Sequence, residues 1–243
     1  MTHCPMPLRN GKLVIEEVKH GIVCFTFDDG HYKHWLEHLE LFRRFNARGT
    51  FFYNREIDAE AADSMKILRQ HDHSVGLHTI SHRDAVDVDM EEYCRTEILP
   101  QINSAARYGV EDLNFFAYPN NRHTPESDTV LSRYFTRFRA GLGIKLPKGF
   151  HIADQDRAFM PLEKISSSRV LGGCGIGEFY ASTLENLDAA LARAAAENKL
   201  IVFFSHDIAP DAKSVHMPTE FLTHLLESAA TLQMTVAGFN ELP

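Results

Sequence analysis

Short apolar segments rich in β-forming residues alternate with segments of helical periodicity along almost the whole chain, and this alternation restricts the fold more than any other feature. The pattern predicts strands at about 21–27, 50–53, 74–77, 113–117, 136–141, 200–205 and 233–237. It predicts helices at 34–45 and at about 58–70, 90–108, 125–135, 183–197 and 217–231. Alternating strands and helices form parallel βαβ units. We therefore expect an α/β fold of about seven parallel strands, either a closed or partly closed barrel or an open doubly wound sheet.

Composition places the chain among globular proteins. No repeat, low-complexity tract or long linker divides it, so we expect one domain over 1–243 with its core at about 21–242. The formal charge of −8 argues against a nucleic-acid partner. No apolar run approaches the ~18 residues that a membrane span needs.

The N-terminal sequence and the cysteines bear on location. Residues 1–10 contain no apolar signal-peptide region, and the cysteines form no CxxC pair. These are Cys4, Cys24, Cys94 and Cys174. A reduced, cytoplasmic setting fits best, with attachment to a membrane surface left open, although an N-terminally trimmed secreted chain would look the same.

A glycine- and serine-rich stretch covers 166–177 (SSSRVLGGCGIG). Two interpretations are a flexible loop and a cradle for phosphate groups. The stretch lacks the lysine and the spacing of a P-loop, so we expect a flexible loop.

Two pairs of polar residues follow predicted strands. Asp28 and Asp29 come directly after the strand 21–27, where burial and mutual repulsion penalise two carboxylates. A bound cation would keep both ionised, whereas a strand-ending turn is the simpler explanation. His78 and His82 follow the strand 74–77, and two histidines four apart can converge on one metal. Because the chain has 14 histidines, this pair could also arise by chance.

A third candidate, His206, ends the apolar strand 200–205, where a histidine in a turn is the competing interpretation. The carboxyl ends of the strands of a barrel meet at one face, so these groups are expected to form one site. One carboxylate and two imidazoles leave coordination positions open for water, while a second carboxylate and a separate histidine supply a base and an acid. The other single histidines are expected to be exposed or satisfied by neighbours: His20, His31, His34, His38, His151, His216 and His224.

The motifs TFDDG (26–30) and HTISH (78–82), followed by the strand-borne His206, resemble the polysaccharide deacetylases of carbohydrate esterase family 4, the NodB-homology group. Residues 49–52 (GTFF) and 73–76 (HSVG) are also similar to family segments, and the resemblance runs from about 21 to 242. It implies a distorted (β/α) barrel. The roles it implies are Asp28 as general base, His206 as general acid, and Asp29, His78 and His82 as ligands of one divalent metal ion. Zinc is the expected metal, and cobalt, nickel or manganese would also suit these ligands.

The third family motif is represented by AYPN at 117–120, which resembles the poly-β-1,6-N-acetylglucosamine deacetylase branch. The resemblance implies that Tyr118 contacts substrate and that the backbone N–H of Asn120 binds the oxyanion. It also implies that Arg139 orients Asp28, a solvated surface arginine being the alternative. The family's DxxDW motif has no counterpart, so the partner of His206 and one side of the pocket are unidentified.

The implied activity is metal-dependent removal of an N-acetyl group from an amino sugar or glycan. One alternative is a deformylase or deacetylase of a lipid- or nucleotide-linked amino sugar in glycan biosynthesis, and another is an O-acetyl esterase. A catalytically silent carbohydrate-binding domain that retains the metal is the alternative from another class. The sequence makes no prediction of the oligomeric state.

Overall fold

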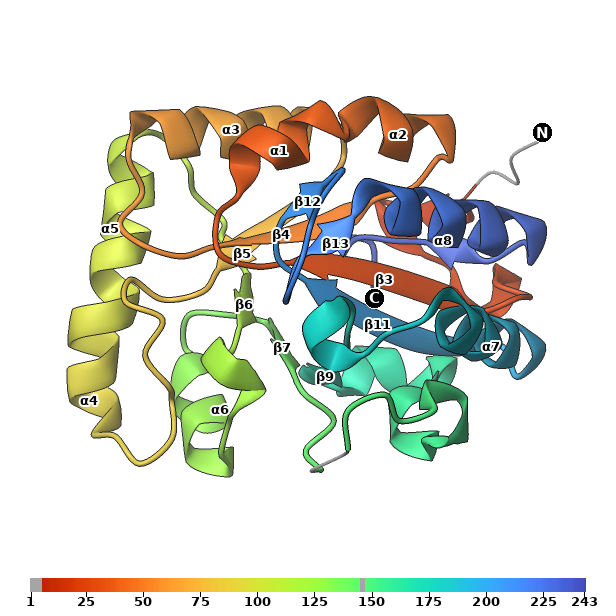
Figure 1. The fold of residues 1–243 in the computed structure, drawn as a ribbon. Helices are drawn as coiled ribbons and strands as arrows, with labels where there is room; N and C mark the ends of the chain where they lie inside the picture. The colour runs from red at the N-terminus through yellow and green to blue at the C-terminus, as the bar shows by residue number, and fades with distance from the viewer. Residues whose placement is uncertain (1–5, 145–146) are drawn as a thin grey trace.

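The computed structural model describes residues 6–144 and 147–243, and Figure 1 shows helices packed around a curled sheet. The strands of the main sheet are β3 (Ile22–Phe27), β4 (Gly49–Tyr53), β5 (Ser74–Leu77), β6 (Phe115–Ala117), β7 (Arg137–Ala140), β8 (Met160–Pro161), β9 (Val170–Gly172), β10 (Cys174–Gly175), β11 (Lys199–Ser205) and β14 (Thr235–Val236). Two small sheets pair β1 (Leu8–Arg9) with β2 (Lys12–Leu13) and β12 (Ile208–Ala209) with β13 (Met217–Pro218).

The main sheet closes on itself through one bent segment. Its order is β10-β11-β3-β4-β5-β6-β7-β9, and the pairs along this order are parallel. Only Gly173 separates β9 from β10, so the segment 170–175 contacts β7 on one side and β11 on the other. The expected distorted barrel with about seven parallel strands is therefore confirmed, and the open doubly wound sheet is excluded.

The same segment corrects one prediction. We expected residues 166–177 to form a flexible loop, but they contain β9 and β10. Two apolar side chains of the segment are buried: Leu171 in the cluster that fills the barrel and Cys174 in the cluster that packs with the helices. The glycines allow neighbouring side chains to approach the backbone closely.

The helices are α1 (Tyr32–Glu37), α2 (Leu39–Arg44), α3 (Ala59–Gln70), α4 (Met90–Tyr93), α5 (Leu99–Arg107), α6 (Pro125–Leu131), α7 (Leu184–Ala196) and α8 (Thr219–Thr231). The predicted helix 34–45 is two helices, because the chain leaves helical geometry at His38, whose ring lies 2.9 Å from the Thr219 hydroxyl. The predicted helix 90–108 contains a π-turn at Cys94–Ile98. Pro100 follows that turn and has no N–H to donate to the preceding turn, which favours this irregularity.

Alternate residues of the strands face opposite sides of the sheet. On β3, Val23, Phe25 and Phe27 pack with the helices, whereas Ile22 and Cys24 join a second cluster that fills the barrel. The period of two continues beyond the strand and directs Asp28 inward. The same parity applies to His206 beyond β11. The fold thus brings polar residues of separate strands to the carboxyl end of the barrel.

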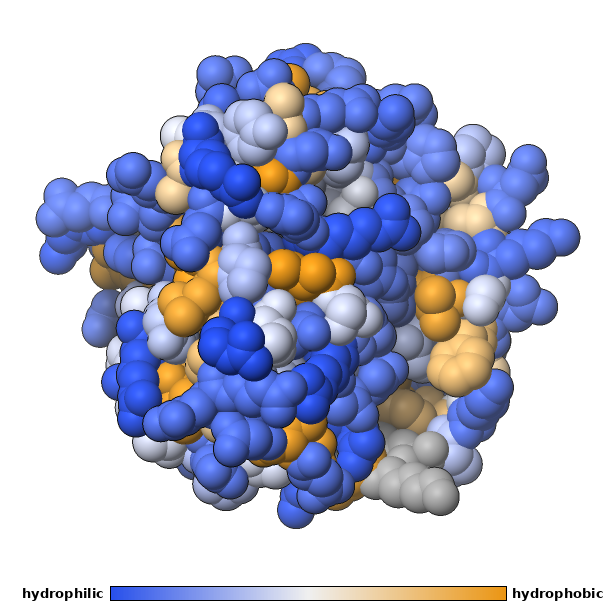
Figure 2. Space-filling model, turned by 90° about the vertical axis from the view of Figure 1, so that its left-hand side faces the viewer, coloured by the Kyte–Doolittle hydropathy of each residue, from blue (hydrophilic) through white to orange (hydrophobic). Residues whose placement is uncertain are grey.

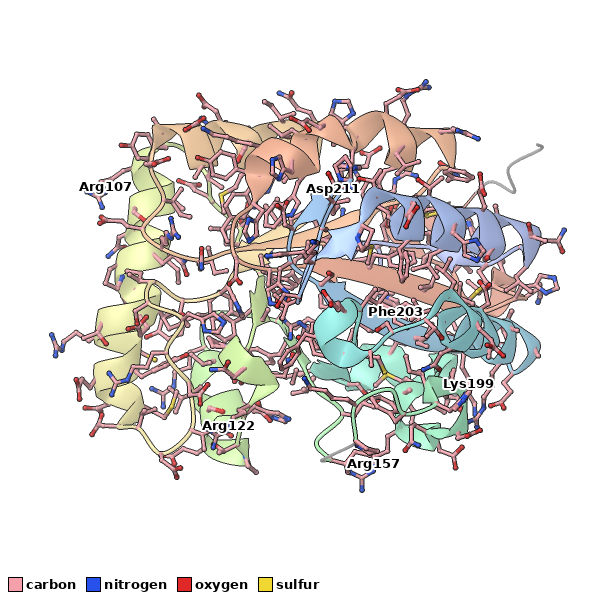
Figure 3. The ribbon with its side chains drawn as sticks, viewed as in Figure 1. Arg107, Arg122, Arg157, Lys199, Phe203 and Asp211 are labelled. Atoms are coloured by element: carbon pink, nitrogen blue, oxygen red, sulfur yellow. The ribbon has the colours of Figure 1, made fainter. Side chains whose placement is uncertain are left out.

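One face of the molecule is mainly hydrophilic, with hydrophobic residues in small separate patches (Figure 2). In Figure 3, Phe203 lies among the central strands, whereas Arg107, Arg157 and Lys199 extend at the periphery. Within 6–144 and 147–243, no helix has both the length and the apolar character required to cross a bilayer.

Candidate active site

Asp29, His78 and His82 form a compact group of metal-ligating side chains at the carboxyl end of the barrel. A carboxylate oxygen of Asp29 lies 3.6 Å from Nε2 of His78 and 3.9 Å from Nε2 of His82. One ligand atom from each residue can be chosen so that all lie within 4.8 Å of one another. The structure thus brings together the three residues that the sequence predicted as ligands.

His78 has a geometry suited to a metal ligand. Its Nδ1 lies 2.8 Å from the backbone carbonyl of Ala117, to which the protonated nitrogen donates. This fixes the tautomer and leaves the lone pair on Nε2, as in many metal-binding histidines. Among the described residues, the buried Nε2 has no hydrogen-bond partner, and neither has Oδ1 of the buried Asp28. Burial lowers the pKa of His78 to about 4, so the ring stays neutral. A divalent cation therefore fits this donor set.

The backbone around the ligands is strained. Asp29, Thr79 and His82 have φ values of 72°, 67° and 60°, in the left-handed region that few residues other than glycine adopt. Such conformations cost ~1–3 kcal/mol each and persist where surrounding contacts enforce them. Gln101, on α5, supplies such a contact, because its amide donates to the backbone oxygens of Thr79 and Arg55 at 3.2 and 2.8 Å.

Asp28 is the second carboxylate of the site and is almost completely buried. Burial alone would raise its pKa, but the opposing charge of Arg139 and the neighbouring His78 and His206 hold the pKa below its ordinary value. Arg139 donates a hydrogen bond to Oδ2 of Asp28. Asp28 is therefore ionised and held in one orientation, as a base requires.

Arg139 is fully buried, so its interpretation as a solvated surface arginine is wrong. Its guanidinium lies over the ring of Phe204, with Cζ 4.8 Å from the ring centroid. It also donates to Oδ1 of Asn121. The sequence gives no signal for this contact, because it joins segments that are remote along the chain.

His206 follows β11 and approaches the same carboxylate, Asp29, as the ligand histidines. Its Nε2 is 3.7 Å from Oδ2 of Asp29, and its Nδ1 donates to the backbone carbonyl of Val215 at 3.0 Å. The indole of Trp35 donates to the carbonyl of His206 at 2.9 Å. The unidentified partner of His206 is thus a backbone oxygen, which directs Nε2 toward the site.

Further histidines lie near His206, and two of them, His34 and His216, have hydrogen-bond partners in Asp207, as expected of side chains satisfied by neighbours. The ring of His216 lies 6.1 Å from that of His206 and 5.2 Å from that of His31. His34 lies 2.7 Å from a carboxylate oxygen of Asp207. Burial lowers the pKa values of His31 and His216. No spacing in the sequence links these residues, which meet only because β3 and β11 are neighbours.

Tyr118 is buried, whereas Asn120, two residues later, is exposed. The Tyr118 side chain is fully buried, and its hydroxyl donates to Asp128 at 2.7 Å. The side chain therefore anchors α6, and the role of Tyr118 in binding substrate or the oxyanion stays a prediction. Asn120 is exposed, with a φ of 52°, and its side chain donates to Asp84 at 2.7 Å. The role of the Asn120 backbone N–H stays a prediction.

Comparison with known proteins gives matches in sequence and in fold. A family model described as polysaccharide deacetylase matches residues 16–137, about half of the chain. A chitin deacetylase of Arthroderma benhamiae is 30% identical over 136 residues, which are 52% of this chain and 34% of that protein. The aligned part of the chain thus spans about a third of the length of this curated relative.

Two solved structures show the same fold. The chitin deacetylase from Colletotrichum lindemuthianum has a TM-score of 0.61 at 15% identity, with 90% of this chain and 86% of that chain covered. A family 4 acetyl xylan esterase from Clostridium thermocellum, in complex with a cobalt ion, has a TM-score of 0.52 at 17% identity, with 86% and 84% covered. Because these identities are low, the two likenesses concern the architecture of the chain.

Proposed function

The chain belongs to the polysaccharide deacetylase family, and on this premise we propose that it removes an N-acetyl group from an amino sugar or glycan with the help of one divalent metal ion. The observation that carries the proposal is the arrangement of two adjacent carboxylates with different surroundings. Asp29 faces the imidazoles of His78 and His82, whereas Asp28 is buried and paired with Arg139. One carboxylate is thus suited to a cation and the other to a proton.

The metal would be held by Asp29, His78 and His82, with zinc as the metal that these ligands suit best. When bound, such a cation polarises a carbonyl and lowers the pKa of a coordinated water. The buried Nε2 of His78 and the absence of a partner for it among the described residues support this assignment.

The residues of the chain then have separate tasks. Asp28, kept ionised by Arg139, accepts the proton of the attacking water. His206, with Nδ1 engaged by Val215, donates a proton from Nε2 to the departing amine nitrogen. The Asn120 N–H is the proposed donor to the oxyanion, and one such donor typically contributes ~3 kcal/mol. Acetate and a free amine are the products.

The experiment is an assay of acetate release from tri-N-acetylchitotriose by purified protein after chelation and after reconstitution with zinc. We expect release only from the reconstituted protein. Formate release from N-formylated and nucleotide-linked amino sugars, and acetate release from an acetylated xylan, test the alternative substrates in the same format. Turnover that survives complete removal of metal would contradict the proposal.

A silent carbohydrate-binding domain is less consistent with the site. Binding alone does not require the buried Asp28–Arg139 pair, because a buried ion pair contributes little net stability. Retention of both Asp28 and His206 around Asp29 supports an enzyme.

A further inference from the structure

We propose that Tyr180 is a substrate-binding residue whose ring forms one side of the pocket and whose hydroxyl donates a hydrogen bond to a sugar oxygen. Tyr180 ends the 3₁₀ turn Glu178–Tyr180, which follows β10 at the carboxyl end of the barrel. This inference rests on the proposed function, because it assigns the amino sugar as the ligand. It places an aromatic residue beside Phe204, which packs against Arg139, the partner of the proposed base.

Glycines of the 170–177 segment create the space for this ring. A Cβ at Gly175 would lie 2.6 Å from the Tyr180 ring, so any larger residue would displace the tyrosine. A Cβ at Gly173 would lie 3.1 Å from the Phe204 ring and 3.4 Å from Cδ of Arg139. The glycine-rich stretch therefore serves neither as a flexible loop nor as a phosphate cradle. It brings Tyr180, Phe204 and Arg139 close to one strand.

A chain of contacts connects Tyr180 to the base. Its ring packs edge-on against Phe204, with 5.3 Å between centroids and an interplanar angle of 82°. Phe204 in turn packs against Arg139, which holds Asp28. Tyr180 is therefore separated from the base by one aromatic ring and one guanidinium. Besides burial, the charges of Arg139, Asp28 and Asp29 all act on the pKa of Tyr180, as expected of a side chain near the proposed base.

The hydroxyl of Tyr180 is suited to donate. Among the described residues no hydrogen bond to it is found, although the residue is only half-exposed. Burial raises the pKa of Tyr180 to about 12, so the group stays protonated at neutral pH. Ligand pockets combine an aromatic surface with a few polar groups that fix orientation. Tyr180 offers both in one side chain.

The loop that carries Tyr180 is docked on the segment that orients His206. The N–H of Phe179 donates to the carbonyl of Ser214 at 2.8 Å, and a Cβ at Gly177 would lie 2.6 Å from that same oxygen. The next residue, Val215, accepts the hydrogen bond of His206. One short segment thus fixes the position of the acid and of Tyr180 relative to each other.

Tyr180→Phe tests the proposal, since it removes the hydroxyl and retains the ring. We expect KM for tri-N-acetylchitotriose to rise ~3–10-fold, as for the loss of one hydrogen bond, with kcat within ~twofold. Tyr180→Ala, which also removes the ring, should raise KM further. Tyr108→Phe is the matched control, because Tyr108 is 42% exposed at the end of α5 and should leave both constants unchanged. An unchanged KM in Tyr180→Phe overturns the proposal.

A binding measurement separates this inference from the proposed function. Calorimetric titration of tri-N-acetylchitotriose into zinc-loaded Asp28→Asn and Asp28→Asn/Tyr180→Phe measures affinity without turnover. We expect the same ~3–10-fold loss of affinity in the double variant. If the wild-type protein releases no acetate, the proposed function fails, and this comparison still decides the role of Tyr180. Equal affinities, or no binding to either protein, overturn the role of Tyr180 alone.

Discussion

Each end of the barrel buries an arginine from β7, and the two arginines donate hydrogen bonds to different kinds of acceptor. Arg139, at the carboxyl end, pairs with the carboxylate of Asp28 and with Asn121. Arg137, at the amino end, donates to the backbone oxygens of Ile165 and Pro243, at 3.4 and 2.6 Å. The carboxyl end thus holds a charge ready to accept a proton. The amino end uses its charge to attach the C-terminal segment.

This contrast shows that the role of a buried arginine depends on whether its hydrogen-bond acceptors are charged carboxylates or neutral backbone oxygens. At the amino end, Phe52, Phe115 and Phe239 pack edge-to-face and fill the barrel. At the carboxyl end, glycines and polar side chains replace such residues. The same inward parity on β7 therefore yields a structural anchor at one end and a functional group at the other.

The strongest way to disrupt the carboxyl end is Asp28→Asn. Removal of a general base typically costs ~10²–10⁴-fold in rate, and we expect kcat to fall by at least the larger of these factors. Because Asp28 is not one of the three clustered ligand residues, zinc content should stay near one equivalent. Turnover and metal content measured on the same preparation check this, and loss of zinc would contradict the division of roles.

His82→Ala should remove metal and activity together. The side chain of His82 is 35% exposed and lies at the edge of the ligand group, so its loss should leave the fold intact. Metal analysis and circular dichroism after gel filtration test this expectation. His224→Ala is a suitable control, because His224 pairs with Asp188 on the outer helices. An active His82→Ala protein without metal would rule out the proposed site.

The two arginines can be compared directly by substitution with methionine. Arg139→Met leaves Asp28 buried without its partner, which typically costs ~3–5 kcal/mol of unfolding free energy. Arg137→Met removes hydrogen bonds to neutral carbonyls only, for which ~1.5–3 kcal/mol is typical. Urea denaturation at neutral pH with metal present measures both. Equal losses would remove the distinction between the two ends.

Glu241, at the amino end of the barrel, should make the free energy of unfolding depend on pH. Burial raises its pKa to about 7, so the folded protein holds a proton there that the unfolded chain has already lost. Stability contributed by this group is complete below ~pH 4.5 and is lost as the pH rises to about 7, by up to ~3 kcal/mol. Unfolding free energies of Glu241→Gln and wild type across this window should diverge accordingly. Parallel curves would contradict the raised pKa.

The unfolding free energies of Glu241→Gln and wild type must be compared with each other, because His73 changes stability with pH in the direction opposite to Glu241. Burial lowers the pKa of His73 to about 3, so its contribution is present above ~pH 6.5 and is lost as the pH falls toward 3. His73 is common to both proteins, and its contribution cancels in the comparison.

Residues whose role follows from local pattern were predictable, and residues that depend on closure of the barrel were not. Asp29, His78 and His82 come directly after or near strand ends, so the period of the strands and the common direction of parallel strands bring them together. Family resemblance added Arg139, which strand parity then directs inward. Asn121 was missed because its contact with Arg139 links two turns whose separation the sequence does not reveal.

Other errors share this cause. The stretch 166–177 has a composition typical of loops, and only its pairing with β7 and β11 makes it part of the barrel. Tyr118 belongs to a motif associated with substrate, but its parity on the strand directs it to the outer layer, where Asp128 binds its hydroxyl. Composition therefore gave the wrong structure for 166–177, and the motif did not reveal that the Tyr118 side chain is buried.

The single residue between β9 and β10 has a consequence for how this chain could diverge from its relatives. An insertion or deletion at Gly173 would exchange the inward and outward sides of β10 and shift Tyr180 relative to Arg139. None of the metal-ligating side chains would change. If Tyr180 binds the sugar as proposed, preference among sugars can change through the length of one short connection while the proposed catalytic residues stay the same.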